Sequence, residues 1–407
     1  MTVVAAPTLF GRELAAGWAV VAGVLATTFT DEVIQVNLAL QYGSVSVAHM
    51  ATILIAGMLG SVSTAFYSLR LYSLLPTGLV ILLGNGVGAA VLACYVVLPG
   101  FWQAVAVSTV AGIAMTLTGS GLAPYMSAAF PGVATSTVSS IVETARNTGV
   151  LVGPAAAGFA AGLLGGRAVA SIAAVAMVVG SLVVATAVMV VGRRVVEPVA
   201  VPGRRFRPGD VREFFGLVGA WPFFVAVLAG VAALVTLNAV LVSFAQQDVH
   251  LTTGEFGCAI TCLSVGLVVG PGLARIAFKR DHSRVGVGGW TATMALSILL
   301  LVLTAEVWTV LALLFVMGVC NGVRNAELRT VIFDAIPRDS MSRLFPVYSA
   351  LLQAAALTGF VATLAASSLL SRAAIIIVGS LLALATGIVI VVSGNDKRTG
   401  GIRESSA

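Results

Sequence analysis

This chain contains very little charge. Only 9% of its 407 residues are Asp, Glu, Lys or Arg, whereas soluble proteins carry about 25%. So few charges cannot cover a water-exposed surface, which excludes an ordinary soluble globular protein. Three histidines and four cysteines leave few side chains for metal binding or nucleophilic catalysis. The surface must be mostly apolar, as it is in a protein surrounded by lipid.

The reactive side chains that are present do not form an enzyme-like pattern. We find no Ser-His-Asp, His-rich or Cys-His arrangement, and no Gly-x-x-x-x-Gly-Lys-Ser/Thr loop for an ATP-driven pump. Cys94, Cys258, Cys262 and Cys320 lie in apolar segments and are interpreted as packing residues. We therefore expect no catalytic site, cofactor or metal. A polytopic membrane enzyme is the least favoured alternative.

The chain is instead rich in apolar residues. It is 59% hydrophobic, with a mean hydropathy of +1.06 and 44 glycines. A crossing of the bilayer needs about 20 apolar residues, so the length suits about twelve crossings with short loops. We predict an all-α integral membrane protein. The expected helices are 15–40, 46–70, 74–98, 102–125, 137–163, 168–192, 217–245, 254–278, 285–304, 306–329, 342–368 and 372–393.

The second half of the chain repeats the first at a constant step. Gly112 pairs with Gly318 and Gly153 with Gly359, since 318 − 112 and 359 − 153 both give 206. Pro131 and Pro337, and Gly60 and Gly266, stand at the same step. Many transporters place a substrate site between two such repeats. The sequence predicts two pseudo-symmetric six-helix bundles and favours transport.

Basic residues collect in alternate loops. Six arginines lie between Arg193 and Arg212, and further clusters surround Lys279, Arg338 and Lys397. This is the positive-inside pattern, so both termini are expected in the cytoplasm and the basic charge does not indicate nucleic-acid binding. The expected organisation is an N-terminal bundle 1–192, a cytoplasmic linker 193–215, a C-terminal bundle 216–393 and a disordered cytoplasmic tail 394–407.

One motif suggests a family. The run Gly149-Val-Leu-Val-Gly153-Pro154-Ala-Ala-Ala-Gly158 on the fifth helix is similar to the Gly-x-x-x-Gly-Pro-x-x-Gly-Gly motif of exporters in the major facilitator superfamily. With six helices, a basic linker and six helices, nearly the whole chain resembles that superfamily and its drug/proton antiporters. The resemblance implies the major facilitator fold, and a gating or structural role for Gly149, Gly153 and Pro154.

The other hallmark of that superfamily is altered here. It follows the second helix as Gly-x-x-x-Asp-Arg/Lys-x-Gly-Arg/Lys-Arg/Lys, but after Gly60 the Asp position holds Thr64. The second copy keeps Gly270 and Arg275 with Ala274 in place of the acid. Loss of the acid in both halves affects the usual gating contact of that loop.

Two adjacent acids lie well inside the first helix. A charge at the centre of a membrane helix costs about 2.5–3.5 kcal/mol, so Asp31 and Glu32 are expected to have a function. Burial and mutual repulsion favour a carboxyl that can gain and lose a proton. We predict that the pair couples transport to protons, with Gln35 on the same face. The alternative is an acid at the outer interface or one that caps polar backbone.

The fifth helix offers a polar stripe. Glu143, Arg146 and Asn147 stand at i, i+3 and i+4, where the first two can form an ion pair. This face is predicted to line the cavity and contact substrate, while the glycines pack on a neighbour and Pro154 permits a bend. A purely structural Glu143–Arg146 pair is an equal alternative.

The tenth predicted helix has a further charged pair. Arg324 and Glu327 stand at i, i+3 and are interpreted as a gate-forming or structural ion pair. Asn238, at the repeat position of Glu32 (238 − 32 = 206), is expected to contribute a neutral polar group to the cavity.

These features lead to one functional prediction. The protein is expected to be a monomeric secondary transporter of the cytoplasmic membrane that exports a small organic molecule in exchange for protons by alternating access. The alternative with the same fold is a symporter or facilitator that imports a small nutrient.

Overall fold

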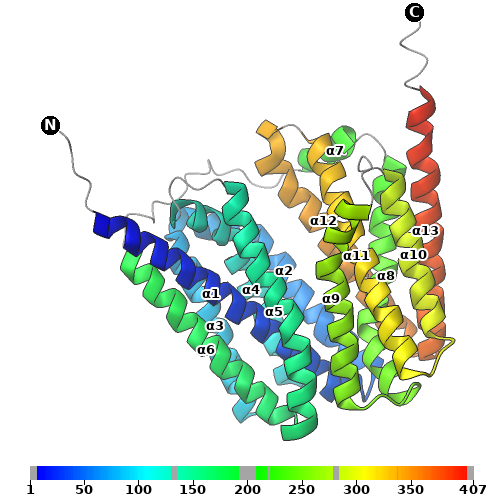
Figure 1. The fold of residues 1–407 in the computed structure, drawn as a ribbon, viewed down its shortest axis with the longest axis horizontal. Coiled ribbons are helices and arrows are strands. Elements are labelled where there is room, and N and C mark those ends of the chain that lie inside the picture. The colour runs from blue at the N-terminus through cyan, green and yellow to red at the C-terminus, as the bar shows by residue number, and fades with distance from the viewer. Residues whose placement is uncertain are drawn as a thin grey trace, which may run out of the picture. The chain divides into compact units, whose positions relative to one another are not determined.

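A computed structural model describes residues 7–129, 135–191, 208–218, 221–277, 284–336 and 338–400. All regular structure in these ranges is helical (Figure 1). The elements are α1 (Pro7–Leu38), the π-helix η1 (Ala39–Gly43), α2 (Val47–Leu74), α3 (Thr77–Val97), α4 (Phe101–Ala129), α5 (Thr135–Leu164), α6 (Gly166–Val191), α7 (Pro208–Val218), α8 (Trp221–Gln247), α9 (Thr253–Ala277), α10 (Arg284–Leu301), α11 (Val307–Ala335), α12 (Arg338–Ala366) and α13 (Arg372–Gly400).

Twelve helices within the described ranges are long and apolar enough to cross a membrane. This confirms the predicted all-α membrane architecture. The additional helix, α7, has 11 residues and lies in the segment predicted as a linker. Residues 193–207 of that segment lie outside the described residues. At the other end, α13 continues to Gly400, into the segment for which we expected disorder.

Prolines mark helix boundaries where the sequence requires them. Pro76 precedes α3 with φ −55° and ψ 136°, and its carbonyl accepts the first hydrogen bonds of that helix. Ile336 ends α11 with extended dihedrals of −98° and 123°. A residue that precedes a proline disfavours helical backbone dihedral angles, and Pro337 follows Ile336 in the sequence.

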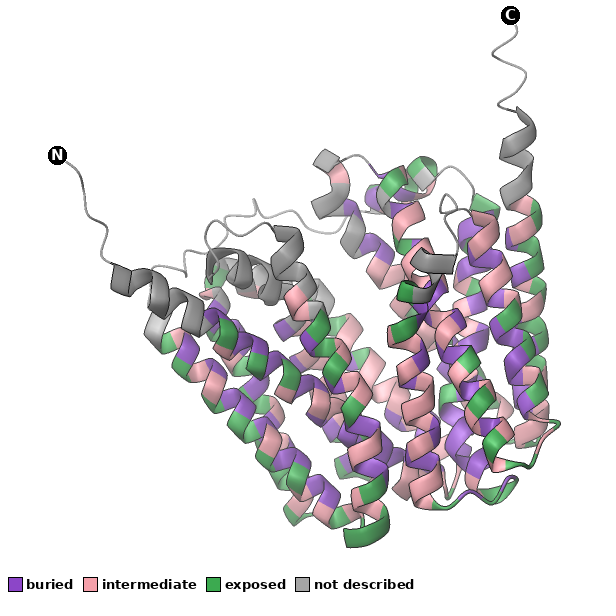
Figure 2. Ribbon diagram, viewed as in Figure 1, coloured by how far each residue is buried: buried purple, intermediate pink, exposed green. Residues whose placement is uncertain are grey.

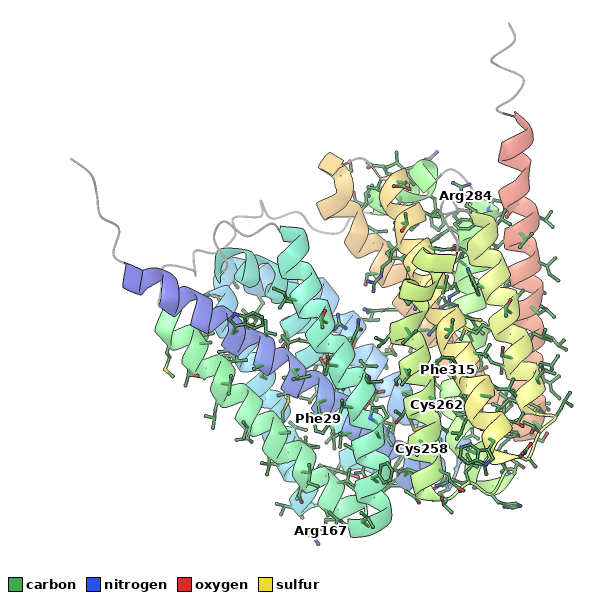
Figure 3. All side chains as sticks on the ribbon, in the orientation of Figure 1. Phe29, Arg167, Cys258, Cys262, Arg284 and Phe315 are labelled. Atoms are coloured by element: carbon green, nitrogen blue, oxygen red, sulfur yellow. The ribbon has the colours of Figure 1, made fainter. Side chains whose placement is uncertain are left out.

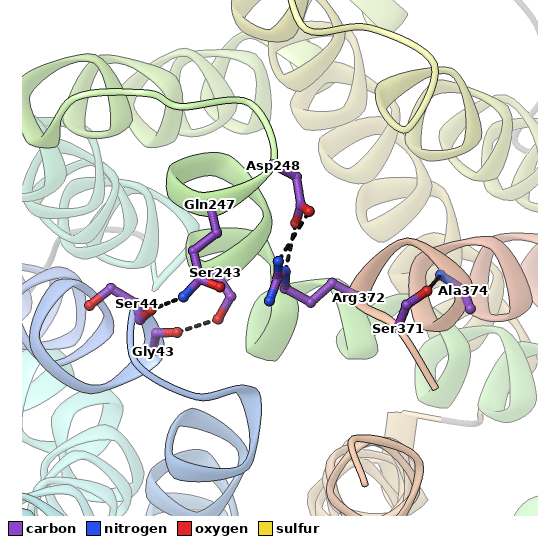
Figure 4. A network of polar contacts seen from close by, with 8 residues as sticks. All are labelled: Gly43, Ser44, Ser243, Gln247, Asp248, Ser371, Arg372 and Ala374. Carbon is purple, nitrogen blue, oxygen red and sulfur yellow. Dashed lines mark hydrogen bonds and ion pairs between the residues drawn. The ribbon is translucent and has the colours of Figure 1, made fainter. Parts of the chain in front are cut away.

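The chain divides into two compact units. Unit 1 consists of Met1–Leu38 and Ala56–Arg205, and unit 2 of Ala39–Ile55 and Phe206–Ala407. Unit 2 thus includes η1 and the start of α2, which the sequence placed with the first six helices. The reason is a polar contact with the end of α8 (Figure 4), where the side chains of Ser243 and Gln247 donate to the carbonyl oxygens of Gly43 and Ser44.

Each unit packs its helices in the same pattern. In unit 1, α1 packs against α5 and α6, and α3 against α4 and α6. In unit 2, α8 packs against α12 and α13, and α10 against α11 and α13. Because α8–α13 follow α1–α6 in the repeat, these are equivalent pairs. The duplication seen in the sequence is therefore also a duplication of helix packing.

Repeated glycines place two helix backbones in contact. A Cβ atom at Gly112 of α4 would overlap the carbonyl oxygen of Gly57 on α2. A Cβ atom at Gly318 of α11 would overlap the carbonyl oxygen of Leu263 on α9, and 263 − 57 is again 206. In the same way, a Cβ atom at Gly60 would overlap the carbonyl oxygen of Thr109, and one at Gly266 would overlap that of Phe315, which is labelled in Figure 3. Only glycine permits this spacing, as in other membrane helix pairs.

Many residues on the outer faces of the helices are exposed (Figure 2), and large apolar side chains are common among them. On α6, Ile172, Val175, Val179 and Leu182 are exposed at helical spacing, while Ala173 is buried on the opposite face. In water such a stripe would be costly, but in lipid it is the expected surface. The apolar exposure therefore agrees with a multi-pass membrane protein.

Candidate functional site

The acids of α1 contact two different parts of unit 1. Asp31 is partly buried and lines a pocket formed within unit 1 by α1, α3, α4 and α6. Including its open side, the pocket comprises about 470 Å³. Gln35, one turn further along α1, donates from Nε2 to Oδ2 of Asp31 at 2.8 Å. The structure thus places Gln35 on the face of Asp31, where the i, i+4 spacing put it.

The pocket also contains polar groups that the sequence did not single out. Asn85 of α3 is 2% exposed and accepts at Oδ1 a hydrogen bond from Oγ1 of Thr118 on α4, at 3.2 Å. Thr27 and Thr30 of α1 also line the pocket, together with Met177 of α6. A lone asparagine in the very apolar α3 was the available signal, because buried amides need partners. Asp31 therefore lies in a partly polar pocket within unit 1.

Glu32 points toward a different helix. A Cβ atom at Gly153 of α5 would lie 2.6 Å from Cβ of Glu32 and 3.1 Å from the carbonyl oxygen of Phe29. Gly149, one turn earlier, lies against the backbone nitrogen of Phe29 and the side chain of Thr28; Phe29 is labelled in Figure 3. The two motif glycines are therefore where α5 touches the acid-bearing segment of α1.

The remaining predicted residues of α5 have mixed outcomes. The side chain of Glu143 lies outside the described residues, so its pairing with Arg146 stays a prediction. Arg146 is exposed, and its charge is close enough to Asp31 to act on it electrostatically. Asn147 is partly exposed, and Pro154 is buried inside an unbroken helix. In unit 2, Asn238 is an exposed residue of α8.

The charged residues of α11 are arranged differently from the prediction. Arg324 donates from Nη2 to Oδ1 of Asn321 and to Oδ1 of Asn325, each at 3.0 Å. The carboxylate of Glu327 lies instead against Gly286 of α10, where a Cβ atom would overlap it. The predicted Arg324–Glu327 pair is therefore replaced by contacts of Arg324 with two neutral amides.

The cysteines lie in packed helices as free thiols. Cys258 and Cys262 lie one turn apart on α9 (Figure 3), both partly buried. Among the described residues, no group of three or more His, Cys, Asp or Glu side chains could hold a metal ion. Packing remains the interpretation of these cysteines.

Comparison with known proteins assigns the fold to a family. The profile of the Major Facilitator Superfamily matches residues 14–292, which is more than half of the chain. The chain belongs to the major facilitator superfamily. It is therefore a secondary active transporter of small molecules that works by alternating access, and not an enzyme. No curated protein matches it by sequence.

Solved transporter structures share this fold. A POT family transporter in complex with 5-aminolevulinic acid has a TM-score of 0.75 at 11% identity, covering 93% of this chain and 96% of that one. PepTSo, also a POT family transporter, gives 0.71 at 9%, covering 97% and 99%. The nucleoside transporter NupG gives 0.70 at 9%, covering 94% and 98%. These likenesses show the fold alone, so the expected resemblance to drug/proton antiporters is established only at the level of the superfamily.

The altered superfamily motif has a local structural explanation. Thr64, which stands at the position of the usual acid, is buried and donates to the carbonyl oxygen of Gly60 at 2.7 Å. A threonine can satisfy its hydroxyl on its own helix in this way, whereas an acid needs an external donor. The side chains of Ala65, Arg70, Ala274 and Arg275 lie outside the described residues.

Proposed function

We propose that this transporter exports a small organic molecule in exchange for protons, with Asp31 and Glu32 carrying the protons. The observation that supports this most directly is the position of Asp31 in a pocket with Asn85 and two threonines. A carboxyl in such a pocket can change its protonation when water, Arg146 or a bound molecule changes its surroundings. Proton exchange at this point would then be linked to the conformation of α1.

Contact between α1 and α5 supports a role for both acids together. Glu32 lies where Gly153 brings α5 against α1, and Asp31 lies on the adjoining face toward the pocket. A change of charge at either acid would act on the same helix pair. The export direction rests on the resemblance of this α5 motif to that of exporters. Arg146 and Asn147 are proposed to line the substrate path from α5, and Asn238 from α8.

The cellular placement is also part of the proposal. The basic residues between 193 and 212 and those near Lys397 favour a cytoplasmic side for the linker and both termini. We place the protein in the cytoplasmic membrane as a monomer. Fusing a reporter that is active only in the cytoplasm to the C-terminus would test the orientation.

The functional test uses the acids. In cells lacking their main efflux pumps, the wild-type protein is expected to lower accumulation of some members of a panel of amphipathic compounds, and a protonophore should abolish this. Asp31→Asn and Glu32→Gln should each remove the proton dependence while expression is unchanged. Glu306→Gln, at an exposed carboxylate that precedes the α11 span, is the matched control and should transport normally.

Three results would contradict the proposal. Gradient-dependent accumulation instead of loss would show that the protein imports. Unchanged proton dependence in both single variants and in the double variant would remove the acids from coupling. An equal loss in Glu306→Gln would mean that carboxylate removal acts non-specifically.

A further inference from the structure

The polar residues of α11 lie largely between the faces that contact α9 and α10. Gly318 and Gly322 lie about 40° apart on the helix and contact α9, at the carbonyl oxygens of Leu263 and Leu267. Glu327 lies roughly opposite, against α10. At about 100° per residue, Arg324 projects between these two directions, on the side of Asn321 and Asn325. Its guanidinium is therefore not used to pack α11 against α9 or α10.

The guanidinium is held in place without being neutralised. Its Nη2 donates to two amide oxygens, on Asn321 and Asn325, which are one helical turn apart. Its Nε is buried and has no hydrogen-bond partner among the described residues. No described carboxylate lies within ion-pair distance of Arg324. Two neutral amides fix the orientation of the fork, but they do not neutralise its charge and they leave its buried Nε without an acceptor among the described residues.

An apolar cluster adjoins this position. Leu328, one turn after Arg324, is buried with Phe214, Leu344 and Tyr348 in a core to which α7, α8, α10, α11, α12 and α13 all contribute. Tyr348 is close enough to Arg324 for the guanidinium to interact electrostatically with the phenol group. Such surroundings strengthen any electrostatic contact and make an unpaired charge costly. A residue retained at that cost inside a membrane helix is expected to meet its counter-ion in function.

We propose that Arg324 binds an oxyanion group, a carboxylate or phosphate, of the transported molecule. Asn321 and Asn325 act as positioning residues that aim the guanidinium, whose planar donors match such a group. The inference rests on the proposed function only in taking the cargo to be a small organic molecule. It is independent of proton coupling at Asp31. The substrate class is thereby narrowed to organic anions.

The test is anion-dependent thermal stabilisation of the purified protein in nanodiscs. Benzoate is compared with neutral benzamide, and inorganic phosphate is titrated in parallel, all at constant ionic strength. Wild-type protein should be stabilised by an anion and not by benzamide, and the stronger of the two anions identifies the group. Arg324→Gln should weaken the apparent affinity at least about tenfold, because a charge-assisted hydrogen bond is lost.

Controls distinguish a site from a structural or general charge effect. Arg329→Gln removes an exposed arginine of the same helix and should leave the stabilisation intact. Arg324→Lys keeps the charge but loses the planar pair of donors, so it should retain part of the anion stabilisation. That partial response would also show that the loss in Arg324→Gln is not caused by misfolding. Without ligand, the Tm of Arg324→Gln should not fall below that of wild type, since it removes an unpaired charge.

The proposal would be overturned by equal anion stabilisation in Arg324→Gln and wild type, by an equal loss in Arg329→Gln, or by no anion-selective stabilisation of wild type. Asp31→Asn should keep the anion response. A loss of proton coupling in Asp31→Asn with the anion response intact would show that proton coupling at Asp31 and anion binding at Arg324 are independent of each other.

Discussion

The contact between α5 and α1 at Gly153 allows a quantitative test. In Gly153→Ala the new Cβ atom would lie 2.6 Å from Cβ of Glu32 and 3.1 Å from the carbonyl oxygen of Phe29. Ordinary contacts begin at 3.4 Å, so the helices must separate by 0.8 Å (3.4 − 2.6) at the closest point. Neither opposing atom is the end of a flexible side chain, and therefore neither can simply rotate away.

The expected cost follows from two opposing terms. Overpacking of this kind costs about 1–3 kcal/mol. Replacing glycine by alanine within a helix raises the free energy of unfolding by about 0.5–1 kcal/mol. Gly162→Ala is the matched control, because Gly162 lies on the same helix and nothing is within 4 Å of its Cβ position. Since the helix term is common to both variants, their stabilities should differ by the overpacking cost alone, about 1–3 kcal/mol.

The measurement is unfolding in detergent micelles, followed by tryptophan fluorescence, together with transport. Gly153→Ala should be less stable than Gly162→Ala and should transport more slowly, because it displaces α1 beside Asp31 and Glu32. Gly162→Ala should match or exceed wild-type stability. If the two variants were equally stable, the close approach of α5 to α1 would be refuted. The α5 motif would then lose its structural link to the acids.

Two further predictions concern other contacts. Thr118→Val should destabilise the protein by about 1–3 kcal/mol, because it leaves the buried oxygen of Asn85 without a donor. Adding Asn85→Leu should recover most of that loss. If the effects of the two substitutions were additive, the pairing would be contradicted. Arg372 donates from Nε and Nη2 to Asp248 (Figure 4), and the two side chains are 34% and 38% exposed. Because solvent screens an exposed ion pair, a double-mutant cycle should give a coupling energy of up to about 1 kcal/mol that decreases as salt is added. A coupling that salt does not change would show that the pair is more shielded than its exposure indicates.

The repeat was predictable because glycines in membrane helices are constrained by backbone contact. Gly112 and Gly318 each lie against a carbonyl oxygen of the neighbouring helix, so their spacing survives although most side chains around them differ. The twelve spans followed from hydropathy and length, which lipid imposes directly. The π-helix at Ala39–Gly43 was not predicted; its last residue, Gly43, accepts a hydrogen bond from Ser243, which is 200 positions away in the sequence.

Side-chain partners were harder to predict than helices. Spacing placed Gln35 beside Asp31, since one rotamer satisfies both groups. The same rule suggested a pair between Arg324 and Glu327, but Asn321 and Asn325 offer closer acceptors and Gly286 leaves room for the carboxylate elsewhere. The partnership of Asn85 with Thr118 joins two helices whose rotation the sequence does not define.

The constant step of 206 residues also distinguishes the features that the two halves share from those that they do not. The two copies share their backbone contacts, while their ionisable groups differ: the neutral Asn238 stands at the position of Glu32, and the cation Arg324 at the position of Thr118 (324 − 206 = 118). The two halves therefore share the helix contacts that build the frame but differ in the ionisable side chains that they carry, so neither half could substitute for the other.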